Sequence, residues 1–163
     1  MIIPVMEIEP AYFEEREEKA RKTYAAQQAL FCPYFDGQVV LNSDGFHHLQ
    51  FSARRERSKQ EQLLKFRLLP LAIQVIHKSG TLQEYRKTLA PVGKKSPRDG
   101  SVQMKEVQYW GFVAIAGTGN PVRIRVIIRR VGDGNITFWS VMPDVKIKDG
   151  RQKLFSANIE DKE

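Results

Sequence analysis

The chain has 163 residues, 42% of them hydrophobic, which is enough to bury the core of one domain. Its 26 Lys and Arg against 19 Asp and Glu give a net charge of +7, which favours polyanionic partners without establishing nucleic-acid binding. A single cysteine excludes an internal disulfide and a cysteine-rich zinc site, and no apolar run has the length of a membrane span. We therefore expect a cytoplasmic protein with no membrane contact and no secretory signal.

The first part of the chain, residues 10 to 80, is predicted to be mainly helical. Residues 10 to 31 begin with a proline and place acidic before basic side chains, the order that a helix dipole favours. A short strand is expected near residues 38 to 41, followed by an extended segment over residues 46 to 51. Ser58 and Glu61 have capping-box spacing and start a second helix that reaches Gly80, in which Pro70 either makes a kink or separates two helices.

The second part of the chain, residues 102 to 148, is predicted to form an antiparallel sheet. A helical turn is expected near Thr81 and Glu84, and the stretch from 90 to 101, rich in Pro, Gly and Lys, predicts a mobile loop. Strand patterns follow over residues 102 to 117 and in a hairpin, and residues 145 to 148 can add an edge strand. This order predicts a single α+β domain over residues 1 to 163, with N-terminal helices packed on a curved antiparallel sheet of about four strands.

The hairpin at residues 122 to 141 is the most informative feature. Asp133-Gly134 between two β-rich runs predicts a two-residue type I′ turn, which sets Arg129 opposite Phe138 and Ile127 opposite Ser140. One face then carries Arg123, Arg125, Arg129 and Ser140, and the other carries Val122, Ile124, Val126, Ile128, Trp139 and Val141. The apolar face is predicted to be core. The basic face is either solvated or meets an anionic ligand.

Two adjacent histidines precede a basic connector and suggest chemistry. Histidine transfers protons near neutral pH, and cations with a hydroxyl are its companions in metal-free phosphodiester cleavage. The candidate catalytic residues are His47, His48, Arg125 and Ser140, and the candidate RNA-binding residues are Arg54, Arg55, Arg57, Arg123 and Arg129. Neighbours on an extended segment point to opposite faces, so one histidine faces the cleft, and the sequence leaves open which. A structural histidine and a solvated basic face are the alternative interpretations.

Other chemistries lack a motif. No glycine-rich loop with a Walker lysine or a dinucleotide fingerprint is present, and the three histidines and one cysteine lack metal-ligand spacing. We therefore predict neither a metal nor another cofactor.

Two segments resemble a known family. Val39-Val-Leu-Asn-Ser-Asp-Gly-Phe-His-His-Leu49, with the helix after it, and Phe138-Trp-Ser-Val-Met-Pro143 resemble parts of the small metal-independent ribonucleases of the barnase, EndoU, colicin and RelE-like fold, especially those of phages and mobile elements. The resemblance covers roughly residues 38 to 143. It implies RNA held on the concave face of the sheet, cleavage by 2′-hydroxyl attack, and a cognate antitoxin or immunity protein as partner.

Within this resemblance, the histidine of the family falls on His47 or His48, its basic residue on Arg54, Arg55 or the hairpin arginines, and its hydroxyl on Ser140. The chain lacks the clear catalytic glutamate of barnase, for which Glu106 is the one candidate we consider. We therefore predict a toxin-type endoribonuclease. The alternatives are a non-catalytic nucleic-acid-binding protein and an accessory protein of a mobile element that binds another protein through its sheet.

Overall fold

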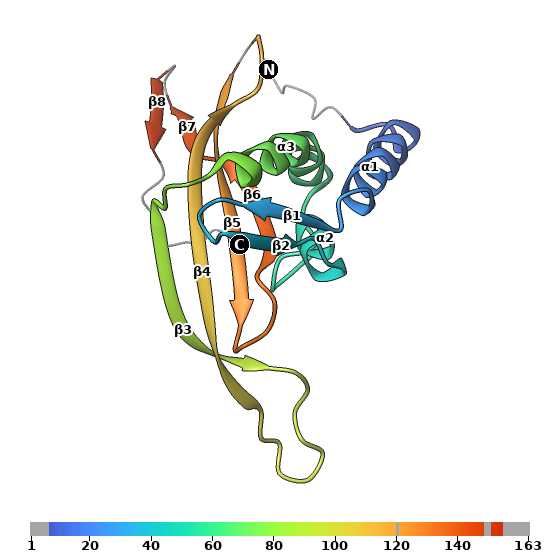
Figure 1. Ribbon diagram of the computed structural model, residues 1–163. Helices are drawn as coiled ribbons and strands as arrows, with labels where there is room; N and C mark the ends of the chain where they lie inside the picture. Colours follow the sequence, from blue (N-terminus) through green and yellow to red (C-terminus); the bar gives the residue numbers. More distant parts are fainter. Residues whose placement is uncertain (1–6, 120, 149–150, 155–163) are drawn as a thin grey trace.

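The computed structural model describes residues 7–119, 121–148 and 151–154, and it has the predicted α+β class (Figure 1). The three described helices are α1 (Pro10–Ala25), α2 (Ser43–Gln50) and α3 (Lys59–Lys78). The strands are β1 (Ala29–Cys32), β2 (Gly37–Val40), β3 (Glu84–Val92), β4 (Gln103–Ala116), β5 (Val122–Val131), β6 (Thr137–Pro143), β7 (Val145–Lys148) and β8 (Arg151–Leu154). None of the described helices is long and apolar enough to cross a membrane.

The main sheet is mixed and has six strands in the order β1-β2-β6-β5-β4-β3. Strands β3 to β6 are antiparallel neighbours. The predicted sheet of about four strands over residues 102 to 148 is matched in part, because it included β4, β5 and β6 but not β3. The β1–β2 hairpin extends the main sheet through one parallel pair, Val40 with Thr137. Figure 1 shows β3 and β4 as long, bent strands at one side of the sheet. Strand β7 was expected at an edge of this sheet, but it pairs with β8 in a separate two-stranded sheet.

The first helix is shorter than predicted. It ends at Ala25 rather than at residue 31, because the segment after it forms β1, in which Leu30 and Cys32 are buried in alternation. Strand β1 pairs with β2 from Ala29↔Val40 to Cys32↔Gly37, so its backbone groups bond to a strand instead of continuing the helix.

The segment with the two histidines is helical, and its prediction as extended was wrong. The Asn42 side chain caps α2 by accepting a 3.0 Å hydrogen bond from the Gly45 amide. Phe46 and Leu49, three residues apart, share the buried side of this helix with Gly45 and His48, whereas His47 is exposed. The two histidines therefore differ in burial because of helical rather than strand geometry.

Helix α3 follows the predicted capping pattern, since Ser58 Oγ accepts from the Glu61 amide at 3.2 Å. Pro70 lies within one continuous 20-residue helix on an exposed position, so the chain does not form two separate helices there. The helical turn predicted near Thr81 and Glu84 was wrong, because β3 begins at Glu84. The predicted loop begins later than expected, since residues 90 to 92 still belong to β3 and the connection to β4 covers residues 93 to 102.

The turn between β5 and β6 differs from the predicted one and shifts part of the register. The Gly134 amide bonds to the Val131 carbonyl at 3.0 Å, and Gly132 has a φ of 57°, so Gly132 and Asp133 are the central residues of the turn. Ile127 is opposite Ser140 as predicted, but a bulge follows, so Arg129 is opposite Thr137 rather than Phe138. Trp139 is the extra residue of this bulge, which removes it from the predicted core face.

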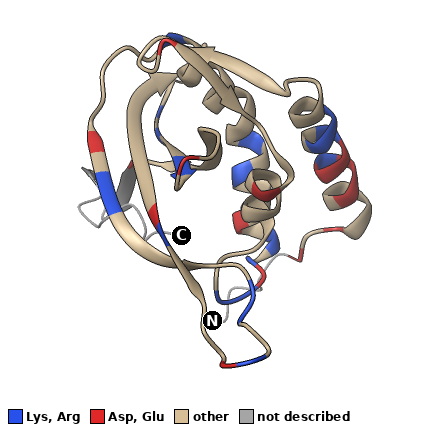
Figure 2. Ribbon diagram, turned by 60° about the horizontal axis from the view of Figure 1, so that its bottom comes forward, with Lys and Arg blue, Asp and Glu red and all other residues tan. Residues whose placement is uncertain are grey.

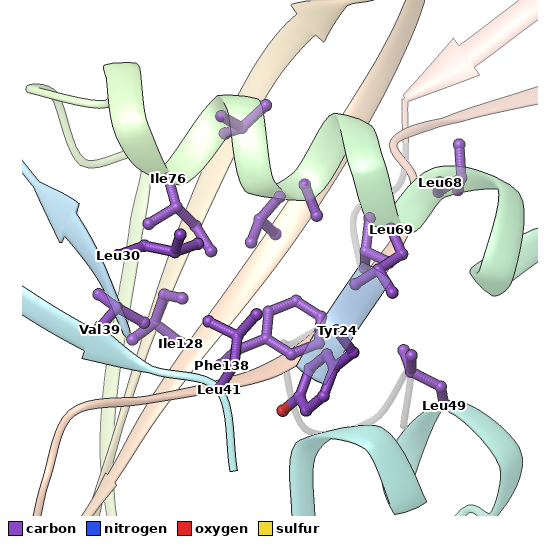
Figure 3. Packing of buried hydrophobic residues seen from close by; sticks show 14 of the residues in the cluster. Tyr24, Leu30, Val39, Leu41, Leu49, Leu68, Leu69, Ile76, Ile128 and Phe138 are labelled. Carbon is purple, nitrogen blue, oxygen red and sulfur yellow. The ribbon is translucent and has the colours of Figure 1, made fainter. Parts of the chain in front are cut away.

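The core lies between the helices and one face of the sheet. Helix α3 contacts α1, β1 and the central strands, and the buried side chains include Leu69 and Ile76 of α3 with Ile128 and Phe138 of the hairpin (Figure 3). Leu30 and Val39 bring the β1–β2 hairpin into the same cluster. The hairpin candidates Arg123, Arg125 and Arg129 alternate with these core residues of β5 and therefore lie on the opposite face of the sheet.

Candidate functional site

The strand register gathers the hairpin candidates on one side of the sheet, which we call the arginine face. Arg123, Arg125, Ile127 and Arg129 alternate along β5, and Ser140 is opposite Ile127. One cross-strand row on this face runs through all four antiparallel strands and consists of Arg86, Tyr109, Arg129 and Thr137. The predicted grouping of the three arginines with Ser140 is therefore present in the structure.

Two of these arginines are held by carboxylates. Arg125 is buried, with Nη2 at 2.8 Å from Asp144 Oδ1 and Nη1 at 2.6 Å from Glu84 Oε1. Arg123 Nε lies 3.1 Å from Asp144 Oδ2. A guanidinium that already holds two carboxylates offers little to a phosphate, so Arg125 is placed to stabilise the sheet, and Arg123 shares Asp144 with it.

Arg129 has a different environment, because it stacks on Trp139. Its Cζ atom lies 3.5 Å from the centroid of the indole ring, and the His48 ring lies 3.9 Å from the same centroid at an interplanar angle of 19°. Two groups so close to one ring cannot share a side of it without overlapping, so Trp139 lies between His48 and Arg129. A tryptophan in this position keeps a histidine and a cation at a fixed separation.

His48 is held by Arg57 as well as by Trp139. Arg57 Nε donates to the His48 carbonyl at 3.0 Å, and its Nη2 lies 3.3 Å from His48 Nε2. A guanidinium can only donate, so this contact fits a His48 tautomer whose Nε2 lone pair faces Arg57. In that tautomer Nε2 is able to accept a proton.

Ser140 is next to this stack and is bonded to a buried lysine. Lys65 Nζ of α3 donates to Ser140 Oγ at 3.0 Å and to the Val141 carbonyl at 2.9 Å. Ser140 is fully buried and Lys65 is 7% exposed. The serine hydroxyl is thus oriented by the Lys65 amino group.

We refer to His48, Arg57, Lys65, Arg129, Trp139 and Ser140 as the stacked cluster. It contains three cationic side chains, Arg57, Lys65 and Arg129, and Glu61 Oε2 lies 3.9 Å from Arg57 Nη1. Arg129 Nε is buried and has no hydrogen-bond partner among the described residues. A buried guanidinium N–H without a partner, in cationic surroundings, suits an anionic ligand such as a phosphate.

The remaining candidates lie outside the stacked cluster. His47 stacks on Phe51 with 4.5 Å between the ring centroids and lines a surface hollow together with Arg21 and Asp44. Arg54 is exposed, and Arg55 pairs with Glu61 at 3.3 Å. Glu106, considered as a general base, points to the other face of β4 and pairs with Lys87 at 3.1 Å. These positions do not bring a carboxylate to His48.

Sequence reasoning missed several members of this region. The burial of Lys65 could have been predicted, because it has helical spacing with the buried residues of α3, namely Gln62, Leu69, Ala72 and Ile76. The position of Trp139 could not have been predicted, because only the bulge turns its side chain toward Arg129. Arg86 and Tyr109 join the site through strand pairing that is not visible along the chain.

Comparison with protein-family models, curated proteins and solved structures finds no match for this chain. Among the described residues, no three His, Cys, Asp or Glu side chains gather where they could hold a metal ion.

Proposed function

We propose that this protein is a metal-independent endoribonuclease of toxin type that acts on RNA in the cytoplasm and is neutralised by an antitoxin or immunity protein. The observation that carries the proposal is the stack of His48, Trp139 and Arg129, with Arg57 on the histidine and the Lys65–Ser140 pair beside it. A proton acceptor, phosphate-binding cations and a hydroxyl are the groups that such a cleavage needs.

In the proposed reaction, Arg57 turns from His48 to the scissile phosphate when RNA binds. His48 Nε2 then takes the proton of the ribose 2′-hydroxyl as the 2′-oxygen attacks phosphorus. Arg129 and Arg57 stabilise the negative charge of the pentacoordinate intermediate, and Ser140, oriented by Lys65, donates to one of its oxygens. The bond to the 5′-oxygen breaks, His48 returns the proton to that oxygen, and a 2′,3′-cyclic phosphate remains.

A second candidate is a protein that binds nucleic acid without cleaving it. It is favoured by the burial of the two reactive side chains, since His48 is 6% exposed and Ser140 is 0% exposed. Arg129 and Arg54 would still contact phosphates in such a protein, and binding would weaken as salt rises.

One experiment separates the two candidates. The purified protein is incubated with total RNA in EDTA beside the His48→Ala variant, with His47→Ala as the matched control on the same helix. We expect discrete cleavage by the wild type, a loss of about 100-fold or more in His48→Ala, and a change below about two-fold in His47→Ala. Intact RNA with salt-sensitive binding would favour the binding protein, and full activity of His48→Ala would overturn the proposed role of His48.

A further inference from the structure

Strands β3 and β4 extend beyond the rest of the sheet as a two-stranded ribbon. The last residue pair between β4 and β5 at this end is Val107 with Val131, whereas β4 continues to pair with β3 as far as Gln103 with Val92. Figure 1 shows this hairpin projecting from the body of the molecule, with the loop of residues 93 to 102 at its tip. We call residues 89 to 106 the β3–β4 arm.

The positive charge of the arm is concentrated at its tip. Residues 89 to 106 contain four Lys or Arg and two acidic residues, and three of the four cations lie in the loop of residues 93 to 102. Lys94, Lys95 and Arg98 are exposed in the tip loop, where no ion pair with another described residue involves them. Figure 2 shows basic segments at the end of this hairpin. The tip of the arm therefore carries three cations that form no ion pair within the described part of the chain.

The arm also continues the arginine face. Lys105 lies on the same face of β4 as Tyr109, the neighbour of Arg129 in the cross-strand row. A Cβ atom at Gly132 would lie 3.5 Å from Lys105 Cδ. Lys105 thus lies over the turn between β5 and β6, between the stacked cluster and the tip. Gln103 is six positions before Tyr109 along β4, which is about 20 Å of strand.

We infer that the β3–β4 arm binds the phosphate backbone of a double-stranded stem, so that the substrate is a structured RNA with a stem beside the segment held at the stacked cluster. This inference rests on the proposed function and specifies its substrate class. Residues 89 to 106 contain no Phe, Trp or Tyr, so the arm offers no ring on which unpaired bases could stack. Cations on a projecting ribbon suit a duplex, which proteins recognise through backbone and shape.

The test measures binding to two 2′-O-methyl RNAs, which cannot be cleaved by 2′-hydroxyl attack. One is a stem-loop and the other is an unpaired strand of equal length. In the full chain, the triple variant Lys94→Gln, Lys95→Gln, Arg98→Gln should bind the stem-loop about 10-fold or more weakly, with a salt slope smaller by about 2 to 3. Its affinity for the unpaired strand should change by less than about two-fold. Thermal unfolding verifies that the variant folds.

The matched control removes three cations from α1 through Arg16→Gln, Lys19→Gln and Lys22→Gln, which lowers the net charge equally. It should leave stem-loop binding within about two-fold of the wild type. Equal losses for both RNAs, equal losses for both variants, or no loss in the arm variant would each overturn the inference. Cleavage in EDTA is a separate readout, so a protein that cleaves RNA with an indifferent arm refutes the arm alone. If the protein cleaves no RNA but the arm variant loses stem-loop binding, the proposed nuclease activity is refuted and the inference about the arm is not.

Discussion

Gly45 shows how closely a single residue of α2 approaches the sheet. A Cβ atom at this position would lie 2.5 Å from the Phe138 carbonyl oxygen and 2.6 Å from the Tyr24 hydroxyl. That hydroxyl already donates to the Asn42 carbonyl, and the Phe138 carbonyl belongs to the backbone of β6, so neither can move aside easily. The glycine therefore allows α2 to approach β6, and with it His48 to approach Trp139.

We expect Gly45→Ala to lower the free energy of unfolding by about 1–3 kcal/mol, because the steric cost outweighs the better helix propensity of alanine. Denaturant unfolding measures the change. Gly80→Ala is the matched control, since no atom lies within 4 Å of its added Cβ, and it should change stability by less than about 0.5 kcal/mol. Equal stability of the two variants would contradict the packing of α2 on β6.

A buried thiol and a buried phenol make the stability of the fold depend on pH in the alkaline range. Burial raises the pKa of the Cys32 thiol and, more strongly, that of the Tyr24 hydroxyl. A raised pKa means that the folded chain keeps its proton while the unfolded chain loses it, so stability is complete below the unfolded pKa and is lost as pH rises above it. The loss begins near pH 8.5 for the thiol and near pH 10 for the phenol, which are approximate unfolded values.

We therefore expect the urea midpoint of the wild type to fall between about pH 8.5 and 10.5. Cys32→Ala should flatten the first part of this decline and Tyr24→Phe the second, although each variant starts from a lower stability at pH 7. The slopes of urea midpoint against pH are compared between wild type and variants, so the contributions of other titrating groups cancel. Parallel curves for the wild type and both variants would show that these two side chains do not cause the pH dependence.

At the scale of elements, the ends of β3, β5 and β6 are joined by ion pairs. Asp144 follows β6 and contacts Arg123 and Arg125 of β5, and Glu84 of β3 completes the network at Arg125. Removing one partner of a buried pair leaves a charge without compensation, which costs more than the pair itself contributes. We expect Asp144→Asn to destabilise the protein by about 3–5 kcal/mol, measured by urea unfolding.

The same sheet supplies the control for this prediction. The pair between Lys87 and Glu106 has both side chains about half exposed, at 53% and 48%. Solvent screens such a pair, so Glu106→Gln should cost less than about 1 kcal/mol. A cost for Asp144→Asn as small as that for Glu106→Gln would mean that the Asp144 network contributes no more than a surface pair.

Elements with a local signal could be predicted, and those decided by tertiary contacts could not. The capping box at Ser58 and the apolar repeat after it determine α3, and alternation determines β4 and β5. Helix α2 has only eight residues, and its two histidines in a row suit a strand as well as a helix, so the Asn42 cap and the approach of Gly45 to β6 decide its conformation. The bulge at Trp139 likewise depends on pairing across β5 and β6.

At the scale of the whole molecule, the candidate site combines local and distant information. The grouping of Arg129 with Ser140 follows from strand alternation, and the burial of Lys65 is visible in the register of α3. The sequence does not show that Arg125 is held by carboxylates while Arg129 stacks on Trp139, because the partners of Arg125 come from β3 and from the end of β6. The contact of His48 with Trp139 depends on both the unpredicted helix and the unpredicted bulge.

The arrangement of the sheet predicts how stability is distributed over the molecule. Residues 107 to 111 of β4 pair with β3 on one side and β5 on the other, whereas residues 103 to 106 pair with β3 alone. Amides are protected most where opening requires disruption of the central sheet, and least where a two-stranded ribbon can open by itself. The arm should therefore open locally while the centre of β4 opens only with the whole fold.

Hydrogen exchange measures this directly within a single strand. We expect the hydrogen-bonded amides of residues 103 to 106 to exchange about 100-fold faster or more than those of residues 107 to 111. An arm that opens by itself before binding gains protection when a stem-loop holds it, so adding the 2′-O-methyl stem-loop should slow exchange at residues 103 to 106 and leave the unpaired strand without effect there. Uniform protection along β4 in the free protein would show that the arm is as stable as the centre of the sheet.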